Sequence, residues 1–163
     1  MLLFLYGCSS TRLAPVPLAA MVLLPPQDIA GPLLLKRKVI MQAAVGEMQF
    51  LMVARFDTER LNLVALLPSG QPLLTLNYDG LELVQQSNAP VEIPGRDILA
   101  IIQFANWPEE SIRRHYRSAE GWILELEANS RILSTPGGVF LKIDRQGEEL
   151  IVDNFAHNYR VLV

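Results

Sequence analysis

Apolar and polar residues alternate along most of the chain after Gly31, which is the pattern of half-buried β-strands. The clearest strand covers residues 49–56, where the apolar set is Phe50, Met52, Ala54 and Phe56. Similar runs predict strands at residues 61–67, 73–76 and 81–85. Turn-forming residues such as Pro68-Ser69-Gly70 and Asp79-Gly80 separate these runs, so we expect a meander of adjacent antiparallel strands.

The periodicity changes to that of helices in the middle of the chain. Ile98, Ile101, Ile102 and Ala105 follow the i, i+3, i+4, i+7 spacing of an amphipathic helix, and we place this helix at residues 97–107. A second, shorter helix should follow, with Asn106 as its N-cap and Pro108 in its first turn. Its charges suit the helix ends: Glu109 and Glu110 come first, and Arg113 and Arg114 come last.

Strands return after Gly121, at residues 122–127, 139–143, 150–152 and 159–163, with turns at residues 129–131, 136–138 and 145–147. The order of elements is therefore strands, two helices, strands, which predicts an α+β fold with a mainly antiparallel sheet. Val64 and Leu66 on one face of a strand oppose Ala65 and Leu67 on the other, so we expect something to cover the sheet's second side, and the first helix is the expected cover.

Composition narrows the function without deciding it. The 163 residues fit one domain, and half of them are apolar while only 19% are charged. This surplus of apolar residues fits a ligand cavity, but it equally fits a tightly filled β core. The net charge is −3, and the only basic run is Lys36-Arg37-Lys38, so we expect no nucleic-acid binding.

Signatures of enzymes and metal sites are missing from the sequence. There is no nucleophile elbow, phosphate-binding loop or zinc-protease motif, and one cysteine with two distant histidines does not resemble a zinc site. We interpret His115 as a helix C-terminal residue, His157 as a turn residue, and Glu125 and Glu127 as a solvated strand face. We therefore expect no catalytic residues, no metal and no cofactor.

The amino terminus carries the most specific motif. Leu5-Tyr6-Gly7-Cys8 resembles a bacterial lipobox, in which cleavage before the cysteine leaves Cys8 to carry the acyl chains. Residues 1–7 are then the remnant of a signal peptide, and no Lys or Arg precedes Cys8, as expected if the start codon is placed too late. Residues 8–30 form the lipidated cysteine and a proline-rich tether. The alternative is an ordinary buried cysteine near a frayed end.

The chain as a whole resembles an uncharacterised family of proteobacterial lipoproteins in the LolA/LolB-like superfamily. The segments that carry the resemblance are the lipobox, Pro68-Ser69-Gly70, Asn77-Tyr78-Asp79-Gly80, Phe104-Ala105-Asn106-Trp107-Pro108 and Asn158-Tyr159-Arg160-Val161-Leu162-Val163. The resemblance implies that residues 31–163 form an incomplete, half-open β-barrel lidded by two helices, with an apolar concavity that receives acyl chains. LolB has an exposed Leu in the matching hairpin loop where this sequence has Ser69, so we expect the protein to hold some other lipid-like molecule.

Ser9 after the cysteine, by the sorting rule that accompanies the resemblance, implies the periplasmic face of the outer membrane. We expect a monomeric, non-catalytic carrier or receptor that binds the acyl chains of a lipid or lipidated partner, with a periplasmic carrier or envelope protein as its counterpart. The first helix would be a movable lid. The cavity lining is predicted as Phe50, Met52, Leu63, Leu76, Ile98, Ile102 and Trp107, although tryptophans also serve as core plugs. The alternative is a structural accessory lipoprotein of an envelope assembly or export machine, with a filled core and no ligand.

Overall fold

A computed structural model describes residues 20–89 and 93–163, which form a single antiparallel sheet of ten strands with two α-helices. The first half of the sheet contains β1 (Leu33–Ala43), β2 (Gly46–Phe56), β3 (Leu61–Leu66), β4 (Pro72–Tyr78) and β5 (Leu83–Ser87). The helices α1 (Gly95–Asn106) and α2 (Glu109–His115) follow. The second half contains β6 (Ile123–Leu126), β7 (Ser130–Thr135), β8 (Gly138–Gln146), β9 (Glu149–Asn154) and β10 (Tyr159–Leu162). Short 3-10 turns lie at Pro26–Asp28 and Ser118–Glu120.

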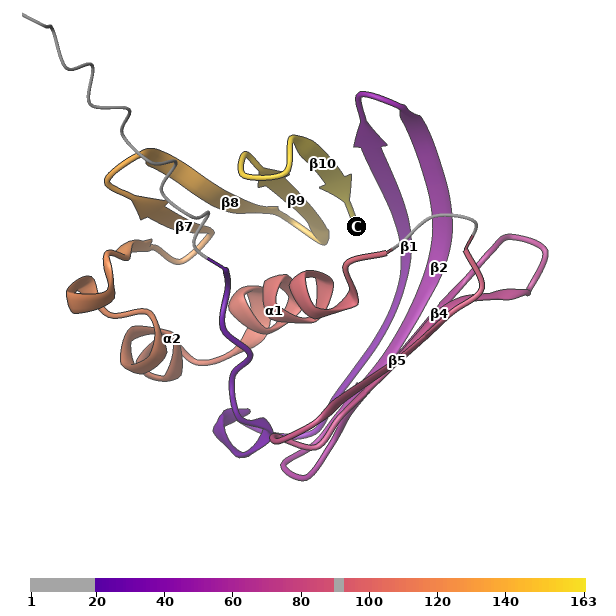
Figure 1. Ribbon diagram of the computed structural model, residues 1–163, viewed down its shortest axis with the longest axis horizontal. Helices are drawn as coiled ribbons and strands as arrows, with labels where there is room; N and C mark the ends of the chain where they lie inside the picture. The colour runs from indigo at the N-terminus through magenta and orange to yellow at the C-terminus, as the bar shows by residue number, and fades with distance from the viewer. Residues whose placement is uncertain (1–19, 90–92) are drawn as a thin grey trace, which may run out of the picture.

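The sheet consists of two meanders joined along one seam. Its order is β5-β4-β3-β2-β1-β10-β9-β8-β7-β6, so each strand pairs with its sequence neighbour except where β1 meets β10. β5 and β6 remain as edges, and the sheet does not close. The curved sheet surrounds α1 on its concave side (Figure 1). The predicted α+β fold with a mainly antiparallel, half-open barrel is confirmed at this level.

The alternation of β2 decides which side chains face inward. Met52, Ala54 and Phe56 are buried on the concave face, whereas Leu51 and Val53 point outward and are 47% and 36% exposed. β3 repeats the pattern, with Leu61, Leu63 and Ala65 buried. The expected cover over the second face is therefore wrong for the described residues, because the helices pack on the inward face that these strands share.

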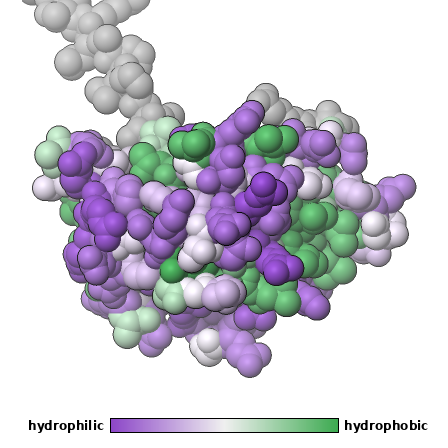
Figure 2. Space-filling model, turned by 90° about the horizontal axis from the view of Figure 1, so that it is seen from below, coloured by the Kyte–Doolittle hydropathy of each residue, from purple (hydrophilic) through white to green (hydrophobic). Residues whose placement is uncertain are grey.

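The outward face of β2 and β3 carries an apolar patch made of Leu51, Val53, Val64 and Leu66, which neighbour one another in the register of the two strands. Seen from below, the part of the molecule formed by the first five strands shows a continuous hydrophobic area beside a mostly hydrophilic surface (Figure 2). Lys36 and Lys38 of β1 pair with Val53 and Leu51, so basic side chains border the patch.

A segment that precedes β1 is bound tightly against the helices. Met21 and Leu24 are buried, and the Leu24 backbone N–H and C=O both bond the side-chain amide of Gln103, at 2.9 and 2.6 Å. Tyr116 donates to the Val22 carbonyl and Trp107 donates to the Pro25 carbonyl. We call residues 21–29 the strap. The folded domain therefore begins before residue 31, because part of the proline-rich stretch assigned to the tether supplies core side chains.

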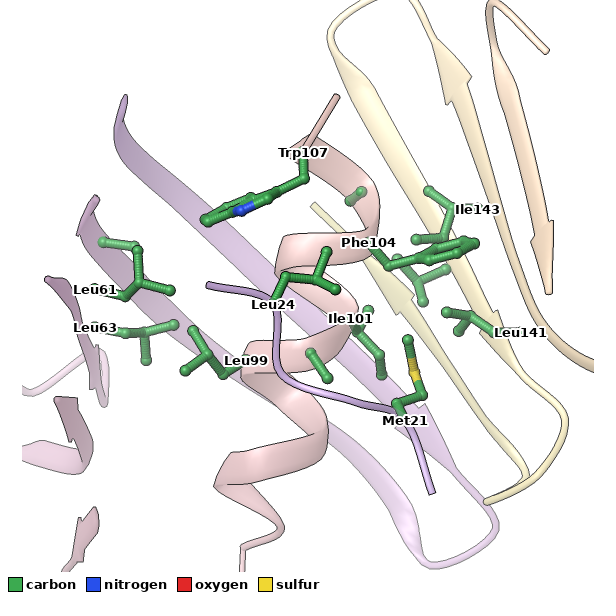
Figure 3. Close-up of a cluster of buried hydrophobic side chains, with 14 of the residues drawn as sticks. Met21, Leu24, Leu61, Leu63, Leu99, Ile101, Phe104, Trp107, Leu141 and Ile143 are labelled. Carbon is green, nitrogen blue, oxygen red and sulfur yellow. The ribbon is translucent and has the colours of Figure 1, made fainter. Parts of the chain in front are cut away.

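α1 is a central helix of the domain. Leu99, Ala100 and Phe104 are fully buried. The close-up of the core shows Leu99 beside Leu61 and Leu63 of the first half of the sheet, and Phe104 on the other side of α1, toward Leu141 and Ile143 of the second half (Figure 3). A chain of edge-to-face aromatic contacts continues this core from Phe104 through Tyr116 and Trp122 to Phe140, with ring centroids 5.4–5.5 Å apart. A helix that is apolar on nearly all sides is held within a core rather than laid over it.

Two arginines from the second half of the sheet donate hydrogen bonds to the last carbonyl groups of α1. Arg131 donates to the carbonyls of Phe104 and Trp107 at 2.6 and 2.9 Å, and Arg145 donates to the Ala105 carbonyl at 2.8 Å. The last carbonyls of a helix have no partners within the helix and carry partial negative charge, so cations are favoured there. Burial lowers the pKa of Arg131, and the positive charge of Arg145 lowers it further.

Several details differ from the sequence prediction. Asn106 is the last residue of α1 and donates to the Ile102 carbonyl; the residue that caps α2 is Pro108, without a side-chain hydrogen bond. The acidic start and basic end of α2 are confirmed. α2 lies against the strap, where Ser111 donates to Asp28 at 2.7 Å, and does not cover the concave face. Strands β1 and β7 were not singled out, and the turn placed at residues 129–131 ends before Ser130.

Candidate functional site

An apolar pocket with a volume of about 270 Å³ lies between α1 and the concave face of the sheet, and we call it the inner pocket. One wall is the helical stripe Ile98, Ile101, Ile102 and Ala105. The opposite wall comes from inward-facing residues of β1 to β4 and from β9 and β10. An apolar cavity of ~150 Å³ stays dry and can hold benzene, so the inner pocket has room for a longer hydrocarbon.

The sheet wall of the inner pocket consists mainly of every second residue along each strand, because these side chains point to the concave face. Leu35, Val39 and Met41 of β1 pair directly with Ala54, Phe50 and Met48 of β2, so the inward residues of two strands form one surface. β9 and β10 extend it across the seam with Leu150, Val152, Tyr159 and Val161. Methionines at positions 41, 48 and 52 give the wall flexible, polarisable side chains that adapt to irregular ligands.

The structure brings together five of the seven residues predicted from the sequence to line a cavity. Phe50, Met52, Leu63, Ile98 and Ile102 all line the inner pocket. Leu76 and Trp107 do not: both are 0% exposed, and Trp107 packs edge-on against Phe56 with ring centroids 5.7 Å apart. Cys8, the predicted lipidation site, lies outside the described residues.

Sequence reasoning missed the part of the wall that β9 and β10 supply. The alternation of Leu150 and Val152 and of Tyr159 and Val161 marked an inward face, but it could not show that this face adjoins β1. Tyr159 is held in place because Asn154, itself buried, donates to the Tyr159 hydroxyl oxygen at 3.0 Å. Burial raises the pKa of Tyr159, so its hydroxyl is neutral at neutral pH.

Four polar side chains also line the inner pocket: Arg37, Asn106, Arg145 and Glu148. Arg37 lies between Leu35 and Val39 on the inward face of β1, and Arg145 and Glu148 lie at the β8–β9 hairpin. Arg145 reaches Asn106 Oδ1 at 3.4 Å in addition to the Ala105 carbonyl. The pocket therefore combines a long apolar wall with a few charged groups.

The titratable residues weighed as catalysts lie apart. His115 ends α2, where its Nδ1 is 2.9 Å from the Ser111 carbonyl, and His157 lies in the β9–β10 turn with its Nε2 3.6 Å from Asp97. Glu125 and Glu127 are exposed. Within residues 20–89 and 93–163, no three His, Cys, Asp or Glu side chains come close enough to hold a metal ion.

Neither α1 nor α2, nor any other helix in the described part of the chain, is long and apolar enough to span a bilayer. No curated protein matches the sequence. Residues 35–163, which include every strand but the start of β1, match the family described as "Protein of unknown function (DUF3261)". The chain belongs to this family.

Proposed function

We propose that the protein is a lipid-anchored, non-catalytic carrier or receptor that holds acyl chains in the inner pocket. The observation that carries the proposal is an apolar pocket of about 270 Å³ between α1 and the concave face of the sheet, in a chain of which half the residues are apolar. Ligand pockets are generally concave and mostly apolar, and at about 270 Å³ the inner pocket lies just below their usual volume of about 300–1,000 Å³. Transfer of each methylene into such a pocket contributes about 0.8 kcal/mol.

The proposed location of the protein is the periplasmic face of the outer membrane. It depends on the resemblance of Leu5-Tyr6-Gly7-Cys8 to a lipobox and on Ser9 after the cysteine. Acyl chains on Cys8 would hold a monomer at the bilayer, close to lipids or lipidated partners. The open, helix-containing sheet also fits the LolA/LolB-like architecture that the sequence resembles. Mass analysis of the amino-terminal peptide tests the anchor, and an unmodified Cys8 would remove it.

Binding of a neutral apolar fluorophore tests the pocket. N-phenyl-1-naphthylamine should bind the protein with a fluorescence increase, and Ala65→Phe should weaken this binding more than tenfold, because Ala65 lines the inner pocket and a phenyl ring would occupy it. Val64→Phe is the matched control, since Val64 is adjacent in sequence but points to the outward face. Ile98→Trp gives a second way to fill the pocket from the helix. Absence of probe binding to the wild-type protein would refute the proposal.

The apolar patch on the outward face favours a second candidate function, that of a structural accessory lipoprotein. Leu51 and Val53 are exposed there with no covering element in the described residues. Such a protein would dock through this face and need no ligand. Native mass spectrometry after gentle extraction from membranes distinguishes the two, because the carrier should retain a lipid-sized mass and the accessory protein should not.

A further inference from the structure

One charged side chain interrupts the apolar wall of the inner pocket. Inward-facing positions of β1 carry Leu35, Arg37, Val39 and Met41 in succession, so Arg37 occupies a place where the fold otherwise puts aliphatic side chains. A guanidinium in apolar surroundings is costly unless it keeps contact with water or with an anion. Arg37 remains exposed, and it has no hydrogen bond or ion pair within residues 20–89 and 93–163.

The pairing of β1 explains how Arg37 stays accessible while lining the pocket. β2 pairs with the whole of β1, but β10 pairs only with Ile40–Ala43. Residues 33–39 therefore have a strand neighbour on one side only within the described chain. Arg37 lies in this stretch, so the inner pocket reaches the surface beside it.

A second positive charge belongs to the same pocket. Arg145 lines it and donates only to neutral oxygens, the Ala105 carbonyl and Asn106 Oδ1. Arg131 lies behind, close enough for the charge of Arg145 to lower its pKa. Glu148 is the one acidic side chain of the described lining, so this lining carries two arginines and a single carboxylate.

We propose that the natural ligand is an anionic amphiphile, with its hydrocarbon chain against the apolar wall and its carboxylate or phosphate bound by Arg37, while Arg145 adds to the positive charge of the pocket. This rests on the proposed acyl-chain binding and adds the class of headgroup. A guanidinium binds either anion through two parallel N–H donors, which a lysine cannot do. Glu148 repels the same headgroup and keeps the binding reversible.

The experiment compares three probes that share a twelve-carbon chain: dodecanoate, dodecyl phosphate and 1-dodecanol. Each displaces N-phenyl-1-naphthylamine from the purified full-length protein at low salt. Both anions should bind about tenfold more tightly than 1-dodecanol, which corresponds to about 1.4 kcal/mol. Added salt should reduce this preference, since it screens the charges at an open site.

Single substitutions test which side chain causes the preference for anions over 1-dodecanol. Arg37→Gln should bring the binding of both anions to within about twofold of the binding of 1-dodecanol, with all three probes compared on the same variant. Lys38→Gln removes the same charge from the next residue, which points outward, and should retain the preference. Glu148→Gln should tighten anion binding severalfold, a gain that a misfolded protein would not show.

The outcomes separate this inference from the proposed function. If the fluorophore binds but the wild-type protein does not prefer either anion over 1-dodecanol, the headgroup site is wrong and the acyl pocket stands. If the fluorophore does not bind at all, the pocket itself fails as a ligand site. Equal losses in Arg37→Gln and Lys38→Gln would show a general charge effect and overturn the role of Arg37. Preference for dodecyl phosphate or for dodecanoate identifies the headgroup and supports the proposal in either case.

Discussion

Replacing Gln103 by an apolar residue of similar volume should strongly lower the free energy of unfolding. Its side chain is 0% exposed, and it is one of few polar residues in the core. The amide nitrogen donates to the Leu24 carbonyl at 2.6 Å, and the amide oxygen accepts from the Leu24 N–H at 2.9 Å. These two bonds join the strap to α1 across 79 residues of sequence.

Gln103→Leu keeps nearly the same volume and removes both bonds. The Leu24 N–H and C=O then stay buried without partners, and each unpaired group costs about 1–3 kcal/mol. We expect the free energy of unfolding to fall by about 2–6 kcal/mol, a large part of the roughly 5–15 kcal/mol that stabilises a typical domain. Urea denaturation followed by the fluorescence of the buried Trp107 and Trp122 measures this change.

Gln86→Leu is the control, because Gln86 is exposed on β5 and its side chain makes no hydrogen bond within the described residues. Its effect should stay within about 0.5 kcal/mol. Amide hydrogen exchange at Leu24 should become faster in Gln103→Leu, while binding of the apolar fluorophore should persist, since the strap lies on the side of α1 away from the inner pocket. A loss below about 0.5 kcal/mol in Gln103→Leu would refute the reasoning, because the strap would then be held by other contacts.

Three further predictions follow from the core. Burial raises the pKa of Tyr116 above the ordinary value of 10.0, so the folded state keeps the phenolic proton to a higher pH than the unfolded state does, and the free energy of unfolding should fall as the pH rises above about 10. Tyr116→Phe should make this fall smaller in denaturation curves measured from about pH 8 to about pH 11. Arg131→Met should lower the free energy of unfolding by about 2–4 kcal/mol, because the carbonyls of Phe104 and Trp107 lose a half-buried cationic donor. Arg131→Lys should recover only part of this lost stability in the same assay. Gly95→Ala should destabilise the protein by about 1–3 kcal/mol although alanine favours helices, because a Cβ there would overlap the side chains of Gln85 and the fully buried Leu76; an unchanged melting temperature would contradict this close approach.

Regular alternation made much of the sheet predictable. In β2 every second residue from Phe50 to Phe56 is apolar and faces inward, and the stripe from Ile98 to Ala105 marks the face of α1 that lines the inner pocket. β1 was not recognised because Lys36-Arg37-Lys38 interrupts its apolar run at the centre. β7 was missed because Ser130 and Arg131 look like turn residues until the pairing with Asp144 and Ile143 is known.

The candidate site shows the limit of periodicity more clearly. Alternation indicates which side chains leave the sheet on the concave face, but not whether they meet a cavity or another side chain. Leu76 and Phe50 have the same pattern, yet Leu76 packs close to Gly95 at the start of α1 and Phe50 faces the inner pocket. The strap was unpredictable for a related reason: its prolines are typical of a linker, and only long-range bonds to Gln103, Trp107 and Tyr116 fix it in the core.

The seam between β1 and β10 has a consequence for biosynthesis. Strands β1 to β5 find their partners locally, as do β6 to β10, but residues 40–43 must wait for residues 159–162. Closing so long a loop is slow, and until it closes the emerging chain exposes the unpaired edge of β1, which lies in the middle of the finished sheet. Such an edge promotes pairing with other chains. The nascent protein should therefore depend on chaperones until its last strand has been synthesised.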